Sequence, residues 1–230
     1  MKKFVLSLLA LCFAALLAYS GWRVWSISED YRNEARMHGA VLEFKPRPEQ
    51  TINQSVIDLQ AKYPDVAGWL TVPGTKIDYP FVWYEDNDYY LRRDLNGGYA
   101  LAGTLFMDFR CEKDFSSPNT IIYGHHMKNG SMFGTIKSFA DKAFFDENAR
   151  GTIFLPGETV TLEFFAYIVT RHTDSEIYSV NPTEAYLDHV KKNARQYRDI
   201  GITESDRLVT LSTCAYEFNN ARMVLLARAV

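Results

Sequence analysis

The sequence has few cysteines, which limits the covalent and metal chemistry open to the protein. Only three occur in 230 residues, and Cys12 lies inside an apolar N-terminal run, which leaves Cys111 and Cys214. Two cysteines cannot form a disulfide framework, although one Cys111–Cys214 bond is compatible with the sequence. His125 and His126 are adjacent and the other three histidines stand alone, so no cluster has metal-ligand spacing. We expect neither a metal nor a cofactor.

Long runs of one charge are also missing. The formal net charge is −3, and no basic cluster occurs beyond Lys2 and Lys3, so nothing in the sequence suggests a nucleic-acid partner. Internal repeats, low-complexity tracts and glycine-rich phosphate loops are absent as well. The chain does have apolar material: 47% of its residues are hydrophobic and 14% are aromatic, which is ample for the core of one domain.

The N-terminus carries the one long apolar run. Residues 4–21 form an uncharged run of 18 residues, with two lysines before it and two tryptophans just after it. Such a helix can just cross a hydrocarbon core about 30 Å thick, and the tryptophans suit its interface. The lysines favour a cytoplasmic N-terminus, with the rest of the chain outside the cell. A cleaved signal with its site near residues 18–20 is the alternative, but the run exceeds the roughly 7 to 15 apolar residues of such signals. We therefore favour a retained, single-pass anchor.

The sequence divides into three regions. We predict a membrane anchor over residues 1–25, a juxtamembrane stalk with some helix over 26–50, and one extracellular domain over 51–230. The domain opens with apolar residues at helical spacing, which predicts a helix that stops at Pro64. These apolar residues are Ile52, Val56, Leu59 and Tyr63.

Short β-like runs dominate the rest of the domain. They are rich in apolar, β-branched and aromatic residues, and turn residues separate most of them. Their ranges are 69–72, 77–83, 103–109, 119–123, 152–155, 159–170, 207–213 and 222–229. About eight strands can close a barrel, so we expect a mainly β fold.

Two further helices interrupt the β pattern. One follows Ser131, and its apolar face consists of Met132, Phe133, Ile136, Phe139 and Ala143. The other is predicted to begin at the NPTE sequence of residues 181–184, with Asn181 as the N-cap and Pro182 as the first helical residue. Its inward face would consist of Tyr186, Leu187, Val190, Ala194 and Tyr197.

The C-terminal segment TLSTCAYEFNNAR is the most informative part of the chain. An apolar strand ends at Cys214, and another begins at Arg222. If the two strands pair as a hairpin, Arg222 lies almost opposite Cys214, and such a cation stabilises a thiolate over a thiol. In a second segment, NTIIYGHHMKNGSMFG, a predicted strand ends just before His125. Singly, each residue is more often structural, but together they are the parts of cysteine nucleophilic catalysis.

These segments together resemble the sortases, and among them the class B sortases of Gram-positive cell surfaces. TLSTC is similar to the family's strand-end TLxTC motif with the nucleophile last, and IIYGHHMKNGSMF resembles the segment around the catalytic histidine. Arg222, eight positions after Cys214, occupies the position that matches the family's arginine. The resemblance also includes DNDYYL at 86–91 and GTLFMDFR at 103–110, and it covers most of the chain beyond residue 50.

The resemblance implies a closed barrel of about eight strands with added helices, and transpeptidation without a cofactor. Cys214 would attack a Thr-Gly or Thr-Asn type bond in the C-terminal sorting signal of an exported protein and form a thioacyl enzyme. An amine of a peptidoglycan precursor or a pilin subunit would then release it. His125, chosen over His126 because it directly follows Tyr-Gly, would transfer protons. Arg222 and the backbone N–H of Ala215 would stabilise the oxyanion or hold the substrate backbone.

The resemblance also implies a peptide groove. The positions that match its lining or lie near its mouth are Asn87, Leu91, Tyr123, Ile177, Tyr178, Ser212, Thr213 and Glu217. Alternation along the strand places Ser212 on the face of Cys214, whereas Thr213 points to the other face unless the strand is distorted. Ordinary packing explains several of these positions equally well.

Two other classes of protein remain open. One is a membrane-anchored β-domain that binds protein or glycan and catalyses nothing, with Cys214 in its core. The other is a cysteine transpeptidase or peptidase of peptidoglycan stems, although its His-Gly-Cys signature is absent because Ser-Thr precedes Cys214. Thiol labelling separates the first from an enzyme, since a buried structural cysteine resists reagents that modify a thiolate in a groove.

Overall fold

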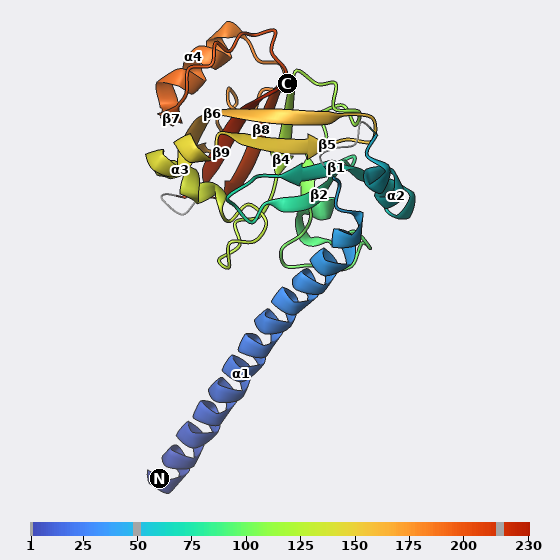
Figure 1. Cartoon of the computed structure of the whole chain (residues 1–230). Helices are drawn as coiled ribbons and strands as arrows, with labels where there is room; N and C mark the ends of the chain where they lie inside the picture. Colours follow the sequence, from blue (N-terminus) through green and yellow to red (C-terminus); the bar gives the residue numbers. More distant parts are fainter. Residues whose placement is uncertain (1, 48–51, 215–218) are drawn as a thin grey trace.

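The computed structural model describes residues 2–47, 52–214 and 219–230, which form a β-barrel with one long helix projecting from it (Figure 1). Within these residues the strand order is β5-β1-β2-β3-β4-β8-β9-β6-β7, and β5 also pairs with β6. Eight strands therefore close on themselves, as expected, and β7 is added outside β6. The strands are β1 (Val66–Thr71), β2 (Asp78–Val82), β3 (Leu105–Met107), β4 (Asn119–Tyr123), β5 (Arg150–Phe154), β6 (Thr159–Arg171), β7 (Ala194–Tyr197), β8 (Leu208–Cys214) and β9 (Ala221–Ala229).

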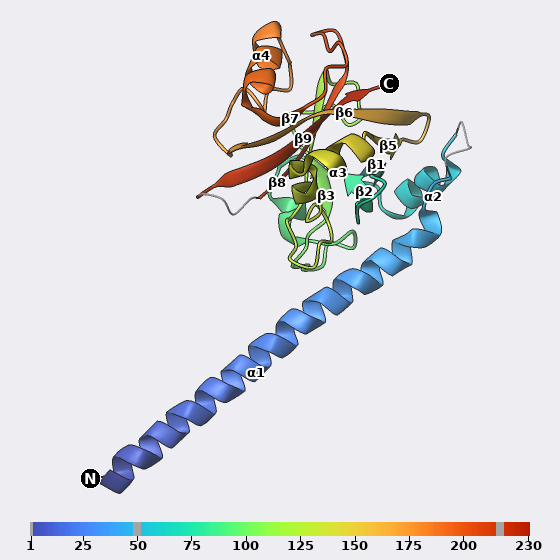
Figure 2. The same ribbon diagram turned by 60° about the vertical axis from the view of Figure 1, so that its left-hand side comes forward.

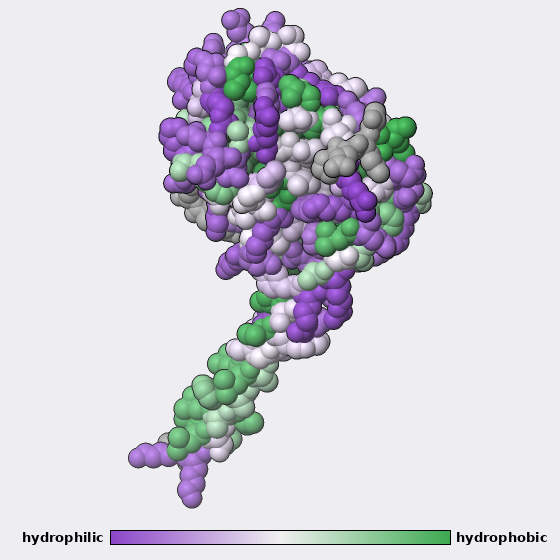
Figure 3. Space-filling view, in the orientation of Figure 1, coloured by the Kyte–Doolittle hydropathy of each residue, from purple (hydrophilic) through white to green (hydrophobic). Residues whose placement is uncertain are grey.

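Helix α1 (Lys2–Val41) runs without a break through the expected anchor and most of the expected stalk. Together with the 3₁₀ helix η1 (Leu42–Phe44), it is long and apolar enough to cross a membrane. Hydrophobic residues cover the visible face of its outer part, and the N-terminal tip is hydrophilic (Figure 3). Figure 2 shows the helix leaving the barrel at one end of the molecule. The predicted boundary near residue 25 does not coincide with any change in secondary structure.

The first domain helix is confirmed, with a later start than expected. Helix α2 (Gln54–Lys62) buries Val56 and Leu59, whereas Ile52 precedes the helix and is 60% exposed. The fully buried Asn53 side chain fixes the start of the helix, because its amide donates to Leu155 O at 2.6 Å and to a neighbouring carbonyl at 3.0 Å. A buried polar group satisfied in this way stabilises the junction between α2 and the barrel.

The helix predicted after Ser131 is wrong as a single element. It is split into η3 (Ile136–Ala140) and α3 (Lys142–Glu147). Met132 has φ of 51°, which a helix does not allow. The break at Asp141 serves α3, since its carboxylate accepts the Phe144 N–H at 2.9 Å as an N-cap.

The last predicted helix is correct in place but too long at both ends. Helix α4 (Glu184–Asn193) is capped by Thr183 rather than Asn181, since the Thr183 hydroxyl accepts the Tyr186 N–H. The expected inward positions at its C-terminal end, Ala194 and Tyr197, belong to β7, which pairs with β6. An open strand edge on β6 outweighs local helical periodicity here, which sequence spacing cannot reveal.

Candidate active site

Three strand ends meet at one end of the barrel. Strands β4 and β8 are parallel, with Tyr123 opposite Ser212, and the Gly124 N–H donates to Ser212 O at 3.1 Å. Two residues further along each chain stand His125 and Cys214, and paired strands lie about 4.8 Å apart. Strand β9 is antiparallel to β8 and pairs Arg222 directly with Cys214. The backbone therefore places the predicted histidine, cysteine and arginine on three adjacent strand ends.

A cleft of about 600 Å³ opens beside these strand ends. His125 and Arg222 both line it. Six of the predicted substrate positions line it too, namely Asn87, Leu91, Tyr123, Tyr178, Ser212 and Thr213. The prediction for Ile177 needs correction, because its side chain is fully buried in the core and does not line the cleft. Ala215 and Glu217 lie outside the described residues.

The imidazole of His125 is held by one strong hydrogen bond. Its Nε2 lies 2.7 Å from Leu91 O, and a carbonyl only accepts, so we assign the proton of the neutral ring to Nε2. Nδ1 is then the nitrogen available for proton exchange. Burial lowers the pKa of His125 and the nearby Arg92 charge lowers it further, while the bond to Leu91 opposes both. Burial therefore favours the neutral ring over the imidazolium.

Close packing around Gly124 explains why a glycine precedes His125. A Cβ at this position would lie 2.4 Å from Leu105 Cδ2 and 2.8 Å from Phe133 Cδ2. The chain passes too close to the core here for any side chain. His126, the next residue, pairs through its backbone with Met132 and does not line the cleft.

An ionic network in the wall of the cleft was not predicted from the sequence. Asp108 is 1% exposed, and Arg110 binds both of its oxygens at 2.8 Å. The Tyr123 hydroxyl also donates to Asp108 at 2.8 Å, and Arg110 donates to Tyr178 O at 3.1 Å. Burial opposes ionisation of Asp108, but these hydrogen bonds outweigh it and its pKa is lowered. The Asp-x-Arg spacing after an apolar strand was the only available signal.

Tyr178 connects this network to the catalytic strand. Its hydroxyl lies 2.9 Å from Ser212 Oγ, and its ring is 6.2 Å from that of Tyr123. Further along the same segment, Asp174 lines the cleft and is bonded to His189 of α4 at 3.1 Å. These contacts tie the segment between β6 and α4 to the wall of the cleft.

Cys111 is a free, buried thiol, so it does not pair with Cys214. Its Sγ lies 3.5 Å from Asn119 O and accepts the Ile121 N–H at 3.5 Å. Burial raises the pKa of the Cys111 thiol. A protonated, enclosed sulfur is a poor nucleophile.

The titration of His125 is a direct check of its surroundings. We expect NMR of the full chain to give a pKa for His125 below the usual 6.5, because burial disfavours the imidazolium. Arg92→Gln should raise that pKa, since it removes a nearby positive charge. A pKa for His125 above 6.5 in the wild type, or a fall on removal of Arg92, would contradict this description of the site.

The barrel and the strand ends beside its cleft indicate the class of protein. The family model described as the sortase domain matches residues 70–230. The chain therefore belongs to the sortase family, and it is a cysteine transpeptidase. Its relatives are of class B: Sortase B of Listeria monocytogenes is 31% identical over 241 residues, covering 100% of this chain and 98% of that protein.

Solved structures agree with this assignment. A mutant form of Clostridium perfringens sortase B has a TM-score of 0.78 and 32% identity, covering 85% of this chain and 98% of that chain. A Staphylococcus aureus sortase B-substrate complex has a TM-score of 0.79 and 25% identity, covering 88% of this chain and 98% of that chain. These similarities give no support to a non-catalytic binding domain or a transpeptidase of peptidoglycan stems.

Proposed function

We propose that this sortase cleaves the C-terminal sorting signal of exported proteins at a Thr-Gly or Thr-Asn type bond and transfers them to an amine. The nucleophile is Cys214, the proton-transfer group is His125, and the cation is Arg222. The observation that carries this proposal is the convergence of β4, β8 and β9 beside one cleft, with Cys214 paired to Arg222.

The first acyl transfer begins with a thiol on Cys214 and a neutral imidazole on His125. His125 takes the proton of the Cys214 thiol through Nδ1 as the sulfur attacks the carbonyl carbon. The guanidinium of Arg222 and the N–H of Ala215 stabilise the oxyanion that forms. The C–N bond then breaks, and His125 returns the proton to the departing amine, which leaves a thioester on Cys214.

The second transfer runs in reverse order. An incoming amine attacks the thioester and gives its proton to His125, and the C–S bond breaks as the new amide forms. The sulfur leaves as a thiolate and regains its proton from the imidazolium. We also assign reception of the incoming amine to Glu217, because the resemblance to class B sortases implies a position near the mouth of the groove for this residue.

Substrate recognition is assigned to the lining of the cleft. Asn87 accepts the Phe109 N–H at 3.0 Å, and Leu91 is 38% exposed on the rim. The Tyr178 and Ser212 hydroxyls are already bonded to each other and can both turn towards a peptide. A Staphylococcus aureus sortase B has been solved as a substrate complex, which supports substrate binding by this chain in general.

The cellular arrangement follows from the N-terminal helix. Residues 1–25 anchor the protein in the membrane with Lys2 and Lys3 on the cytoplasmic side. Residues 26–50 connect this anchor to the catalytic domain of 51–230, which faces the cell wall. The partners are surface proteins with a sorting signal, and the acceptor is a peptidoglycan precursor or a pilin subunit.

Product analysis tests the proposed function. The full chain in detergent is incubated with a library of sorting peptides, with and without candidate amines, and the products are identified by mass spectrometry. We expect cleavage after threonine and, with the right amine, a new amide at that threonine. Cleavage elsewhere, or no amide with any amine, would contradict the proposal.

Arg222→Lys is expected to reduce kcat by about 10² to 10³, the usual effect of losing an oxyanion donor. An ammonium keeps the charge but loses the planar fork of N–H donors. Thermal melting should change little. Arg228→Lys is the matched control, because Arg228 lies on the same strand and bonds Glu163 rather than lining the cleft. A lysine enzyme within about threefold of wild type, under 1 kcal/mol, would remove Arg222 from the catalytic set.

A further inference from the structure

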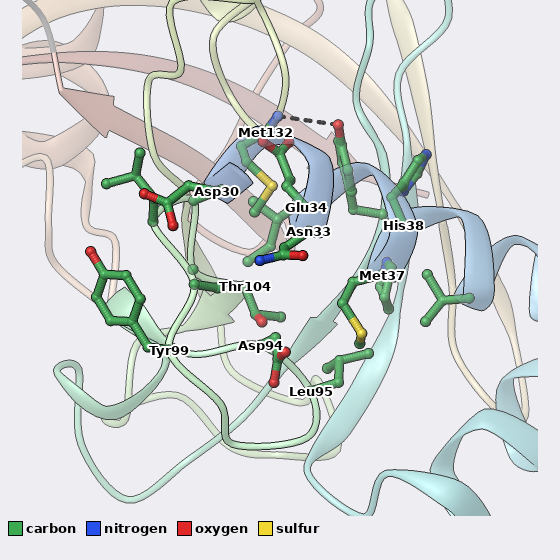
Figure 4. A pocket seen from close by; sticks show the side chains of 18 residues that line it. Asp30, Asn33, Glu34, Met37, His38, Asp94, Leu95, Tyr99, Thr104 and Met132 are labelled. Atoms are coloured by element: carbon green, nitrogen blue, oxygen red, sulfur yellow. Dashed lines mark hydrogen bonds between the residues drawn. The ribbon is translucent and has the colours of Figure 1, made fainter. Parts of the chain in front are cut away.

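The last quarter of α1, residues 31–41, packs on the barrel instead of standing free. It covers a small cavity of about 70 Å³, and Asn33, Glu34, Met37 and His38 point into that cavity from the helix (Figure 4). The opposite wall comes from Tyr79, Met132 and the segment 94–105. Both parts of that wall are connected to His125.

The first connection reaches the backbone of His125. The His38 ring lies 4.6 Å from the Tyr79 ring, and the Tyr79 hydroxyl accepts the Met132 N–H at 3.3 Å. The neighbouring Phe133 N–H donates to His125 O at 3.0 Å. One ring contact and two hydrogen bonds thus connect α1 to the backbone of His125, near the start of residues 124–135, here called the histidine loop.

The second connection reaches the imidazole. Gly103, under the helix, has φ of 58°, and a Cβ there would lie 2.5 Å from Leu91 O, the acceptor of the His125 Nε2 proton. Thr104 N donates to Tyr90 O at 3.1 Å. The segment 94–105 therefore packs directly against the carbonyl that orients the ring.

The docked helix also buries polar groups that a simple tether would leave in water. Glu34 Oε2 and His38 Nδ1 are both buried and have no hydrogen-bond partner among the described residues. The carboxyl of Glu34 faces the Ser131 hydroxyl and the Lys76 ammonium, and Ser131 belongs to the histidine loop. Burying such groups costs free energy, which other contacts between residues 31–41 and the barrel have to offset.

We propose that residues 31–41 of the anchor helix are a positioning element for His125, acting through Tyr79 and Met132 on its backbone and through segment 94–105 on the Leu91 carbonyl. This inference rests on the proposed role of His125 in transpeptidation. It makes the catalytic geometry dependent on how the membrane-proximal helix sits on the barrel.

The test uses the full chain in detergent with His38→Ala, Tyr79→Phe and the double variant. Tyr79→Phe keeps the buried ring and removes only the hydrogen bond to Met132. Each single variant should lower kcat by about tenfold with KM unchanged, as small misplacement of a catalytic group does. Both act on one chain of contacts, so the double variant should be no worse than the poorer single variant. Because burial is the main cause of its low pKa, His125 should titrate closer to 6.5 in all three.

Arg32→Ala is the matched control: although Arg32 falls within residues 31–41, its side chain is exposed, does not line the cavity, and bonds only Ser28 and Glu29 among the described residues. It should keep wild-type kcat and His125 titration. Variants that melt earlier but leave kcat and the His125 titration unchanged would overturn the inference and give the helix a structural role alone. If the wild type transfers no peptide, the proposed function fails, but the His125 titration still decides whether the helix positions the ring.

Discussion

Cys214→Ala is expected to abolish both cleavage and transfer while the fold stays intact. The chain then lacks the atom that forms the thioester, and loss of a catalytic nucleophile removes about 10⁶ in rate in comparable enzymes. The substitution leaves the backbone pairing of β8 with β9 in place. Thermal melting and the dispersion of the NMR spectrum should therefore match the wild type. The measurement is turnover of one sorting peptide with and without the acceptor amine.

Cys111→Ala is the control for this experiment. Cys111 is 2% exposed and its sulfur is enclosed by the backbone of β4, so its removal should cost stability and leave the rate unchanged. Turnover by the Cys214 variant near the wild-type rate, or loss of turnover only in the Cys111 variant, would remove Cys214 as the nucleophile.

His125→Ala is expected to lower the rate by about 10² to 10⁴, the usual contribution of a general acid and base. His126→Ala should change it little, because His126 does not line the cleft whereas His125 does. The two residues are chain neighbours of the same type, so the pair controls for loss of an imidazole and for local backbone effects. Equal defects in kcat/KM, or a larger one at His126, would show that the wrong histidine has been assigned.

The closed barrel could be predicted because its strands obey local rules. Residues 119–123 and 159–170 are rich in apolar, β-branched and aromatic residues, and β4 and β6 lie where these runs predict them. Their neighbours in space could not be predicted, since β4 pairs with β8 across a long stretch of chain. Strand pairing depends on the whole barrel, and periodicity within one segment does not report it.

The errors also have physical reasons. Ile177 was assigned to the groove by chain position, but it is drawn into the core. Asp108 and Arg110 were missed because an acid and a base two residues apart look like ordinary surface charge, whereas the fold buries Asp108 and gives its carboxylate hydrogen bonds from Arg110 and Tyr123. Such networks form between segments, so they are visible only once the segments are placed.

The packing of α1 on the barrel could not be predicted from the sequence either. Its charged sequence predicted a stalk, and nothing in residues 31–41 indicates that His38 packs on Tyr79. The contact joins two residues that are far apart in the sequence, so local periodicity cannot report it. The division into anchor, stalk and catalytic domain stays a prediction. Part of the predicted stalk, residues 31–41, packs on the predicted domain.

Trapping the acyl enzyme tests directly whether Cys214 is the nucleophile. The full chain is mixed with a sorting peptide in the absence of an amine, digested, and examined by mass spectrometry. We expect the peptide containing Cys214 to gain the mass of the acyl fragment before the cleaved bond, and the acceptor amine to remove this added mass. Cleavage of the sorting peptide with no such adduct, or with the adduct on another residue, would contradict the role of Cys214.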